Sequence, residues 1–154
     1  MNNTPNFVKR MEAARRLGVS GAQAHRAFMR ALNKALVPHK LTATQFFVIH
    51  QVHTSGPMSQ ADVADFLCVE SQTLVRLLDD MEKQGWVKRV PDSSDRRVKR
   101  VHLAVTDQRI QAVLDVFNSM KAEALASFSD EELEIYMRLQ TKFAEGLAAS
   151  QLQQ

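Results

Sequence analysis

The side chains best suited to chemistry in this 154-residue chain lie on one face of a short amphipathic segment, residues 71–82. The opposite face is apolar and consists of Leu74, Leu77, Leu78 and Met81, a spacing that predicts a helix with its polar side chains turned outward. These outward residues are Ser71, Gln72, Thr73 and Arg76. Glutamine can pair with adenine, arginine with guanine, and a hydroxyl group with a base or a phosphate. The face is either a solvated surface or a reader of the major groove, and the lack of acids between Glu70 and Asp79 favours the reader.

A second polar cluster follows at residues 95–100, where four of the last five residues are cationic. It comes after the turn-forming stretch 91–95 and lies between two segments rich in β-branched residues, 86–90 and 98–103, which predicts a β-hairpin. Arginine inserted into a narrow minor groove is a recurring mode of shape readout. We expect Arg97 to be that arginine and Asp95 to fix its guanidinium by a bidentate pair. The alternative is a hairpin whose charges only keep it soluble.

Further residues around these two clusters are expected to contact DNA. They are Ser59, Gln60, Lys88, Arg89, Arg96 and Lys99. Lys88, Arg89 and Lys99 are expected to meet phosphates, which strengthens binding to every sequence alike.

Four capping sequences indicate where helices begin. They are Thr42–Gln45, Ser129–Glu132, Ser20–Gln23 and a weaker one, Ser59 with Asp62. In each, the hydroxyl can accept the amide three residues on, and an apolar stripe of helical period follows. Gly18 and Gly21 weaken continuity between residues 7–17 and the next stripe, whereas Gly85 suits the end of the helix at residues 71–82.

Two short helices joined by a tight turn and followed by a hairpin predict a winged helix-turn-helix. The fold class is therefore mainly α with a small β-hairpin wing. We expect a single domain over residues 1–154, with a DNA-binding lobe at about 42–104 and a helical dimerisation region at about 7–37 and 105–149.

This arrangement resembles the MarR/SlyA family of bacterial winged-helix transcription regulators, from about residue 26 to residue 145. The most specific stretches are Leu41–Phe46, Ser59–Ala64, Thr73–Glu82 and Asp95–Leu103, and Phe46–His53 fits the SlyA branch. The resemblance implies a homodimer with its first, fifth and sixth helices intertwined, bound to palindromic DNA through Arg76 and Arg97. It also implies that small aromatic anions relax DNA binding.

Two positions depart from the family pattern. Ala104 stands where relatives usually have a helix-capping threonine, so Thr106 is expected to cap the next helix later. Cys68 occupies a turn position where many relatives have glycine. Because a positive φ costs a cysteine about 1 kcal/mol, we expect that turn to adopt another shape.

Two apolar groups are expected to serve assembly and ligand binding. The C-terminal stripe Ile135, Leu139, Phe143 and Leu147 exceeds what one winged-helix core of this size can bury and predicts dimerisation. A second group, His25, Phe28, Met29 and Phe47, is expected to line an effector cleft.

Other function classes find little support. The chain lacks a phosphate-binding glycine loop or a plausible catalytic pair, so we expect no enzyme activity, no cofactor and no metal. The single Cys68 rules out an internal disulfide and, with no signal peptide or membrane-spanning run, suggests a cytoplasmic, nucleoid-associated protein. Two alternatives stay open. One is a winged-helix protein-interaction module that binds no DNA; the other is a metal or redox sensor built on His50 and His53 or on Cys68.

Overall fold

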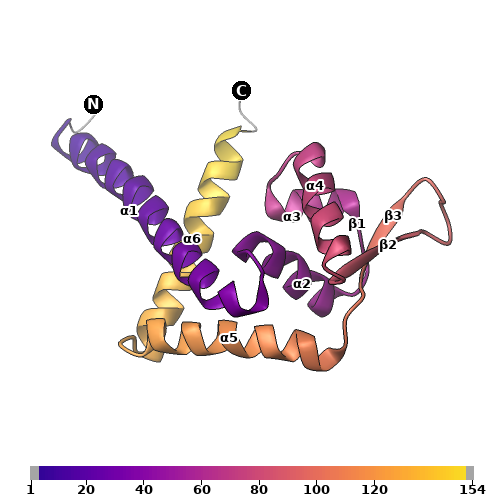
Figure 1. Cartoon of the computed structure of the whole chain (residues 1–154). Helices are drawn as coiled ribbons and strands as arrows, with labels where there is room; N and C mark the ends of the chain where they lie inside the picture. Colours follow the sequence, from indigo (N-terminus) through magenta and orange to yellow (C-terminus); the bar gives the residue numbers. More distant parts are fainter. Residues whose placement is uncertain (1–3, 152–154) are drawn as a thin grey trace. The chain divides into compact units, whose positions relative to one another are not determined.

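The computed structural model describes residues 4–151, which form six α-helices, one 3-10 turn and one three-stranded antiparallel sheet (Figure 1). The chain divides into two compact units, one up to Met120 and one from Lys121 onward. The first unit contains a helix-turn-helix and a β-hairpin, and this confirms the predicted fold class.

Helix α1 runs without interruption from Thr4 to Leu36 and is followed by the 3-10 turn η1 (Val37–His39). The prediction of a helix start at Ser20 is wrong, because the Ser20 hydroxyl donates to the Leu17 carbonyl at 3.2 Å inside the helix. Gly18 and Gly21 lower helix propensity by about 1 kcal/mol each, which is too little to break a helix of this length.

Helix α2 (Ala43–Ser55) begins at the predicted capping box. The Gln45 amide donates to the Thr42 hydroxyl at 3.3 Å, and the Thr42 amide donates to the Gln45 side chain at 2.9 Å. The next amide, that of Ala43, donates to Asn33 Oδ1 at 2.8 Å, which ties the start of α2 to α1. Helix α6 (Asp130–Gln151) starts with the same reciprocal box at Ser129 and Glu132.

The helix-turn-helix consists of α3 (Gln60–Leu67) and α4 (Ser71–Lys83). Between them Cys68 has φ 52° and ψ 44°, so the expectation of another turn shape is wrong. The Cys68 amide donates to Asp65 O and the Val69 amide to Ala64 O, both at 3.1 Å. These two bonds form a Schellman motif with cysteine in the position that glycine usually occupies.

The same motif ends α4, here with the predicted glycine. Gly85 has φ 73°, its amide donates to Glu82 O, and the Trp86 amide donates to Met81 O, both at 2.9 Å. The chain therefore turns directly from α4 into the hairpin.

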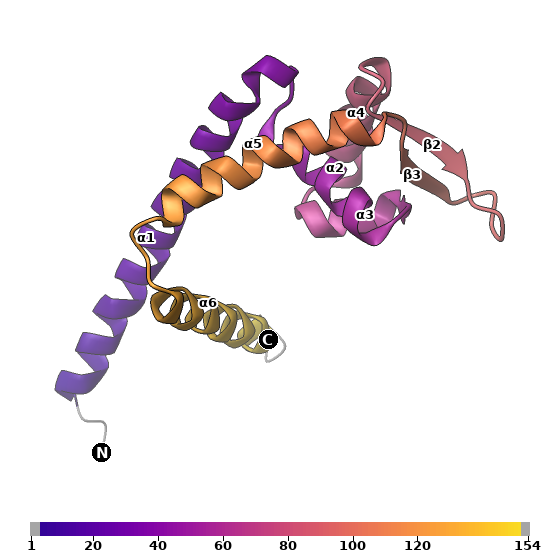
Figure 2. The same cartoon turned by 90° about the horizontal axis from the view of Figure 1, so that it is seen from below.

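The sheet has the order β1-β3-β2, with β1 at Met58–Ser59, β2 at Val87–Pro91 and β3 at Lys99–Leu103. The hairpin register pairs Val87 with Leu103 and Pro91 with Lys99. We call the β2–β3 hairpin the wing, and Figures 1 and 2 show its tip extending beyond α4. The hairpin is as predicted, whereas the two-residue strand β1 was not predicted.

A single apolar core supports these elements. It contains residues from α1, α2, α3, α4, the hairpin and α5 (Asp107–Leu125), and Trp86 is its largest fully buried side chain. Helix α5 begins directly after Thr106, the later capping position that Ala104 led us to expect. Within residues 4–151 no helix is long and apolar enough to cross a membrane.

Candidate nucleic-acid interface

Helix α4 divides into a buried face and a polar face, as its sequence predicts. Leu74, Leu78 and Met81 are buried in the core, and Leu77 is half-buried. The proposed reading residues, Ser71, Gln72, Thr73 and Arg76, are all exposed in the first half of the helix. The helix can therefore enter a groove without disturbing the packing that holds it.

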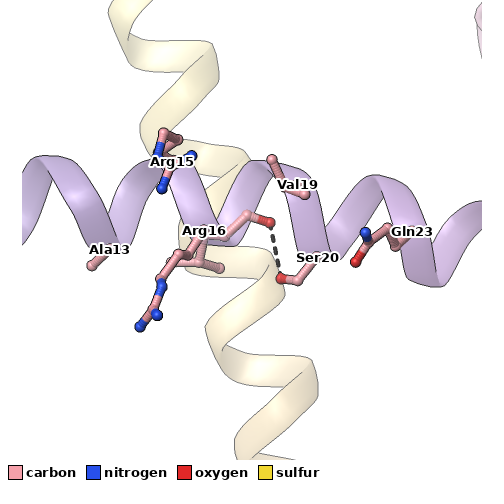
Figure 3. A pocket seen from close by; sticks show the side chains of 7 residues that line it. Ala13, Arg15, Arg16, Val19, Ser20 and Gln23 are labelled. Atoms are coloured by element: carbon pink, nitrogen blue, oxygen red, sulfur yellow. Dashed lines mark hydrogen bonds between the residues drawn. The ribbon is translucent and has the colours of Figure 1, made fainter.

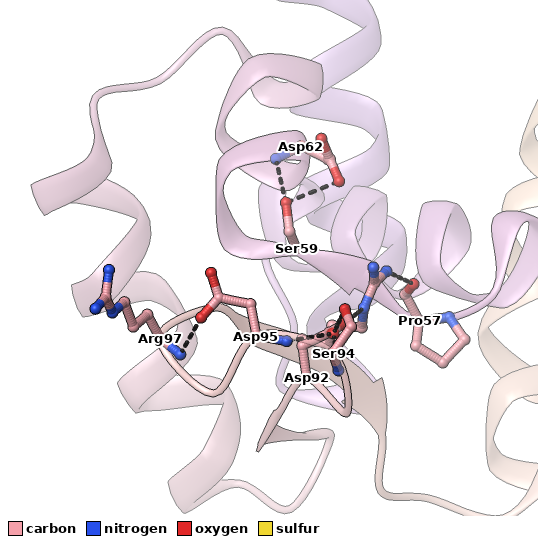
Figure 4. A network of polar contacts seen from close by, with 8 residues as sticks. Pro57, Ser59, Asp62, Asp92, Ser94, Asp95 and Arg97 are labelled. Carbon is pink, nitrogen blue, oxygen red and sulfur yellow. Dashed lines mark hydrogen bonds and ion pairs between the residues drawn. The ribbon is translucent and has the colours of Figure 1, made fainter.

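The wing presents four cations to solvent, because Lys88, Arg96, Arg97 and Lys99 are all exposed. We expected Asp95 to hold the Arg97 guanidinium, but it does not. Its carboxylate accepts the Arg97 backbone amide at 2.9 Å instead, and Figure 4 shows the Arg97 side chain extending away from that contact. The reason is local, since an aspartate carboxylate reaches the amide two residues on in an Asx turn.

Asp92, which the sequence analysis did not single out, is the carboxylate that organises the wing loop (Figure 4). Its Oδ1 accepts the amide of Ser94 at 2.8 Å, the hydroxyl of Ser94 at 2.5 Å and the amide of Asp95 at 3.2 Å. Its Oδ2 is bound by Arg100 Nε. The Arg100 and Ser94 hydrogen bonds hold the pKa of Asp92 well below its usual range. An aspartate that opens a Ser-Ser turn was the available sequence signal.

Arg89 is not free to meet phosphate, contrary to our expectation. Its Nη2 lies 2.5 Å from both Asp79 Oδ1 and Glu82 Oε2 of α4, and its side chain is only 18% exposed. Its backbone amide also donates to Glu82 Oε1 at 2.7 Å. The Glu82 hydrogen bond raises the pKa of Arg89, and the same bond lowers the pKa of Glu82. Lys88, on the other side of the pleat, is exposed.

Ser59 and Gln60 lie where β1 passes into α3, and both are half-buried. The Ser59 hydroxyl donates to Asp62 Oδ2 at 2.7 Å and accepts the Asp62 amide at 3.1 Å. Ser59 is thus occupied in capping α3, while Gln60 Oε1 is buried without a hydrogen-bond partner among the described residues.

The four residues expected around an effector are only partly brought together. The rings of Phe28 and Phe47 stack with centroids 6.3 Å apart, and Phe117 meets Phe28 edge-on at 6.2 Å. Phe28, Met29 and Phe47 are half-buried against the core, whereas His25 is exposed.

Two surface hollows lie elsewhere in the described chain. One of about 670 Å³ is lined entirely by residues 13–23 of α1 and includes Arg15, Arg16 and Val19 (Figure 3). The other, of about 380 Å³, lies at the base of the wing and is lined by Pro57, Asp92, Arg100 and neighbouring residues. Neither is lined by the four residues expected around an effector.

The histidines expected as alternative metal ligands have different surroundings. His50 lies near the rings of Phe46 and Phe117, at 5.8 and 5.9 Å, and His53 is exposed. In the part of the chain that the structure describes, no three His, Cys, Asp or Glu side chains are grouped as metal ligands would be.

The C-terminal stripe is exposed on α6, with Ile135, Leu139, Phe143 and Leu147 at 40%, 54%, 42% and 52% exposure. Four apolar residues of α1 are exposed as well, namely Val8, Met11, Leu17 and Val19. Apolar side chains of this size and number are unusual on the surface of a monomer.

Comparison with known proteins links this geometry to one family. Residues 41–99 match the family model of the MarR family. Two similar solved structures have TM-scores of 0.74 and 0.73. The first is a cysteine-to-serine mutant of MarR from E. coli complexed with operator DNA, at 24% identity over 82% of this chain and 92% of that one. The second is a MarR transcriptional regulator from Methanosarcina mazei Go1, at 23% identity over 86% and 97%.

A third structure is more similar in sequence. Reduced AbfR bound to DNA is 27% identical over 92% of this chain and 98% of that chain, with a TM-score of 0.68. The family match covers the helix-turn-helix and most of the wing, and the fold similarity extends over most of the chain. These findings show that residues 41–99 match the MarR family and that the chain has the winged helix-turn-helix fold of MarR structures.

Proposed function

We propose that this chain is a homodimeric transcription regulator that binds a pseudo-palindromic DNA operator and is modulated by a small aromatic or anionic ligand. The MarR family, whose model matches residues 41–99, consists of transcription regulators, not enzymes. One observation carries the proposal: an exposed polar face on α4 and an exposed cationic wing belong to the same folded unit. AbfR and E. coli MarR, which share this fold, have been seen on DNA.

Within the DNA-binding lobe, residues 42–104, we assign three kinds of contact. Base edges are read by Gln72 and Arg76, with Ser71 and Thr73 beside them. Phosphates are bound by Lys88 and Lys99, with Gln60 at the start of α3 as a further contact to the DNA backbone. The Ser59 hydroxyl, which donates its proton to Asp62, supports this contact only by capping α3. Arg97, supported by Arg96, enters the minor groove, and Asp95 shapes the backbone next to it through the Arg97 amide.

The helical segments 7–37 and 105–149 are proposed to form the dimer. Supporting this, both α1 and α6 expose apolar side chains that a second copy would cover. A two-fold dimer also places two α4 helices on one duplex about one helical turn apart, which a pseudo-palindrome requires.

The ligand site is proposed around Phe28, Met29 and Phe47, with His25 at its rim. The stacked pair Phe28–Phe47 offers flat apolar surface, and His25 offers a hydrogen-bonding group at the exposed end. A ligand that binds the DNA-incompetent arrangement more tightly lowers DNA affinity by shifting the population.

The experiment that tests DNA reading is selection of duplexes from a random library by the wild-type protein, Gln72→Ala, Arg76→Ala and a control, Lys40→Ala. Lys40 is exposed and lies outside both the DNA-binding lobe and the dimerisation segments. The wild type and the control should enrich the same pseudo-palindrome. Each α4 variant should bind it about 1–3 kcal/mol more weakly and lose preference at the base it reads. No enrichment by the wild type would favour a protein-interaction module instead. The same preference and affinity in all four proteins would refute Gln72 and Arg76 as the residues that read bases.

A further inference from the structure

We propose that Asp92 is a positioning residue of the wing: its carboxylate fixes the loop that presents Arg96 and Arg97 before DNA is met. The inference rests on the proposed DNA-binding function. Asp92 touches no DNA in this account and acts only through the backbone and the arginines that it arranges.

The loop is closed by backbone bonds at its two ends. The Asp92 amide donates to Val98 O at 2.8 Å, and the Val98 amide donates to Asp95 O at 2.9 Å. Inside that frame, Asp92 Oδ1 takes three donors from Ser94 and Asp95. The side chain that does this is 8% exposed, whereas residues 93–97 around it are exposed. Because the exposed loop has little apolar packing, the hydrogen bonds to this one buried carboxylate hold it in place.

The second carboxylate oxygen ties the loop to the rest of the lobe. Asp92 Oδ2 is bound by Arg100 Nε, and Arg100 Nη1 donates to the Pro57 carbonyl at 3.2 Å. Pro57 precedes β1, whose Ser59 caps α3. Polar contacts thus lead from the wing loop through Arg100 to Pro57, two residues before the Ser59 that caps α3 (Figure 4).

This arrangement gives the wing cations two different functions. Arg100 is engaged inside the lobe, while Arg96, Arg97 and Lys99 remain exposed. Ordering a loop on binding costs conformational entropy for each residue that becomes fixed. A loop already ordered by Asp92 avoids much of that cost, so removing the carboxylate weakens binding although the variant is more positive.

The test compares wild type with Asp92→Ala, Asp92→Asn, Arg97→Ala and the double variant Asp92→Ala/Arg97→Ala. Asp65→Ala is the charge control, because Asp65 is exposed in the same lobe and its side chain makes none of these contacts. The probe is the duplex enriched by the wild type, with the wing-facing flanks either all A/T or all G/C. We expect Asp92→Ala to bind the A/T-flanked duplex about tenfold more weakly than the wild type does, with a smaller loss of affinity for the G/C-flanked duplex. In a protein that already carries Arg97→Ala, Asp92→Ala should cause little further loss of DNA affinity.

If only charge mattered, Asp92→Ala and Asp65→Ala would both bind DNA more tightly than the wild type. Tighter binding by Asp92→Ala to both duplexes would therefore overturn the inference. So would losses that simply add in the double variant. Trp86 fluorescence checks folding, and if Asp92→Ala unfolds the lobe, Asp92→Asn carries the comparison, because it keeps an acceptor for the loop amides but cannot pair with Arg100.

A readout without DNA separates this inference from the proposed function. Amide hydrogen exchange at Ser94 and Asp95 should be slow in the wild type and fast in Asp92→Ala, with the β2–β3 amides unchanged. Equal exchange in both proteins would refute the role of Asp92 even if the chain binds DNA. Slow exchange in a wild type that binds no duplex would instead refute the DNA-binding function.

Discussion

Three arginines of the hairpin have different roles because their guanidinium groups have different partners. Arg89 is paired with Asp79 and Glu82 of α4, Arg100 with Asp92, and Arg97 is exposed. The sequence shows a run of cations and predicts a charged wing, which is right. It does not show which cations are already neutralised, because the partners of Arg89 lie seven and ten residues away on a helix that only the fold places beside β2.

Cys68 shows the limit of a local rule at the level of one residue. The cost of a left-handed cysteine is real, but the two Schellman bonds and the half-buried Val69 hold the turn in that conformation. Tertiary structure therefore outweighs the preference of the residue.

Replacing Cys68 with glycine should remove the free-energy cost of its left-handed conformation. Cys68→Gly should raise the free energy of unfolding by up to about 1 kcal/mol, because glycine adopts the left-handed region without strain. Urea denaturation followed by Trp86 fluorescence measures it. Gly85→Ala is the matched opposite and should be destabilising, since Gly85 has φ 73°. If Cys68→Gly is no more stable than Cys68→Ser, the turn carries no strain.

Among the secondary-structure elements, α4 and β2 are joined by the contacts of Arg89 with Asp79 and Glu82. Glu82 accepts both the backbone amide and the side chain of Arg89, so the end of α4 and the start of the wing are joined by adjacent hydrogen bonds. These bonds hold α4 and the wing, the two elements proposed to contact DNA, directly against one another.

Neighbouring residues of β2 allow a direct test. Arg89→Ala should lower the free energy of unfolding by about 1–3 kcal/mol, because it leaves two partly buried carboxylates without their partner. Lys88→Ala should leave stability unchanged and reduce the salt dependence of DNA binding by roughly one counterion. Denaturation and duplex titration of both variants provide the measurements. The opposite pattern would favour a phosphate contact for Arg89 and contradict its role in joining β2 to α4.

The sequence predicted the starts of helices correctly where the capping side chain and the third helical residue bond each other's backbone amides. The boxes at Thr42 and Ser129 start helices as predicted. The similar box at Ser20 fails because a hydroxyl inside a continuous helix satisfies itself on the preceding turn. Strand β1 escaped prediction because its two residues are fixed by pairing with β3 and not by their own pattern.

For the whole molecule, the fold class and the similarity to the MarR family were predictable because the apolar periodicities and the hairpin are encoded locally. The candidate site was predictable only as two exposed clusters, since its internal contacts join residues far apart in sequence, as Arg100 and Pro57 are. Apolar side chains exposed on both α1 and α6 show what a single copy leaves uncovered. These exposed faces lead us to expect a dimer.

The most direct test of the account measures how many chains bind one enriched duplex, and how strongly, as the salt concentration rises. Analytical ultracentrifugation of the wild type and of Leu139→Glu on α6 supplies both quantities. We expect two wild-type chains on each duplex and an affinity that falls steeply, roughly 10³-fold or more between 50 and 200 mM salt. Leu139→Glu should dissociate to monomers and bind far more weakly. One chain per duplex, or an affinity that salt does not change, would contradict the account of a dimeric DNA-binding regulator.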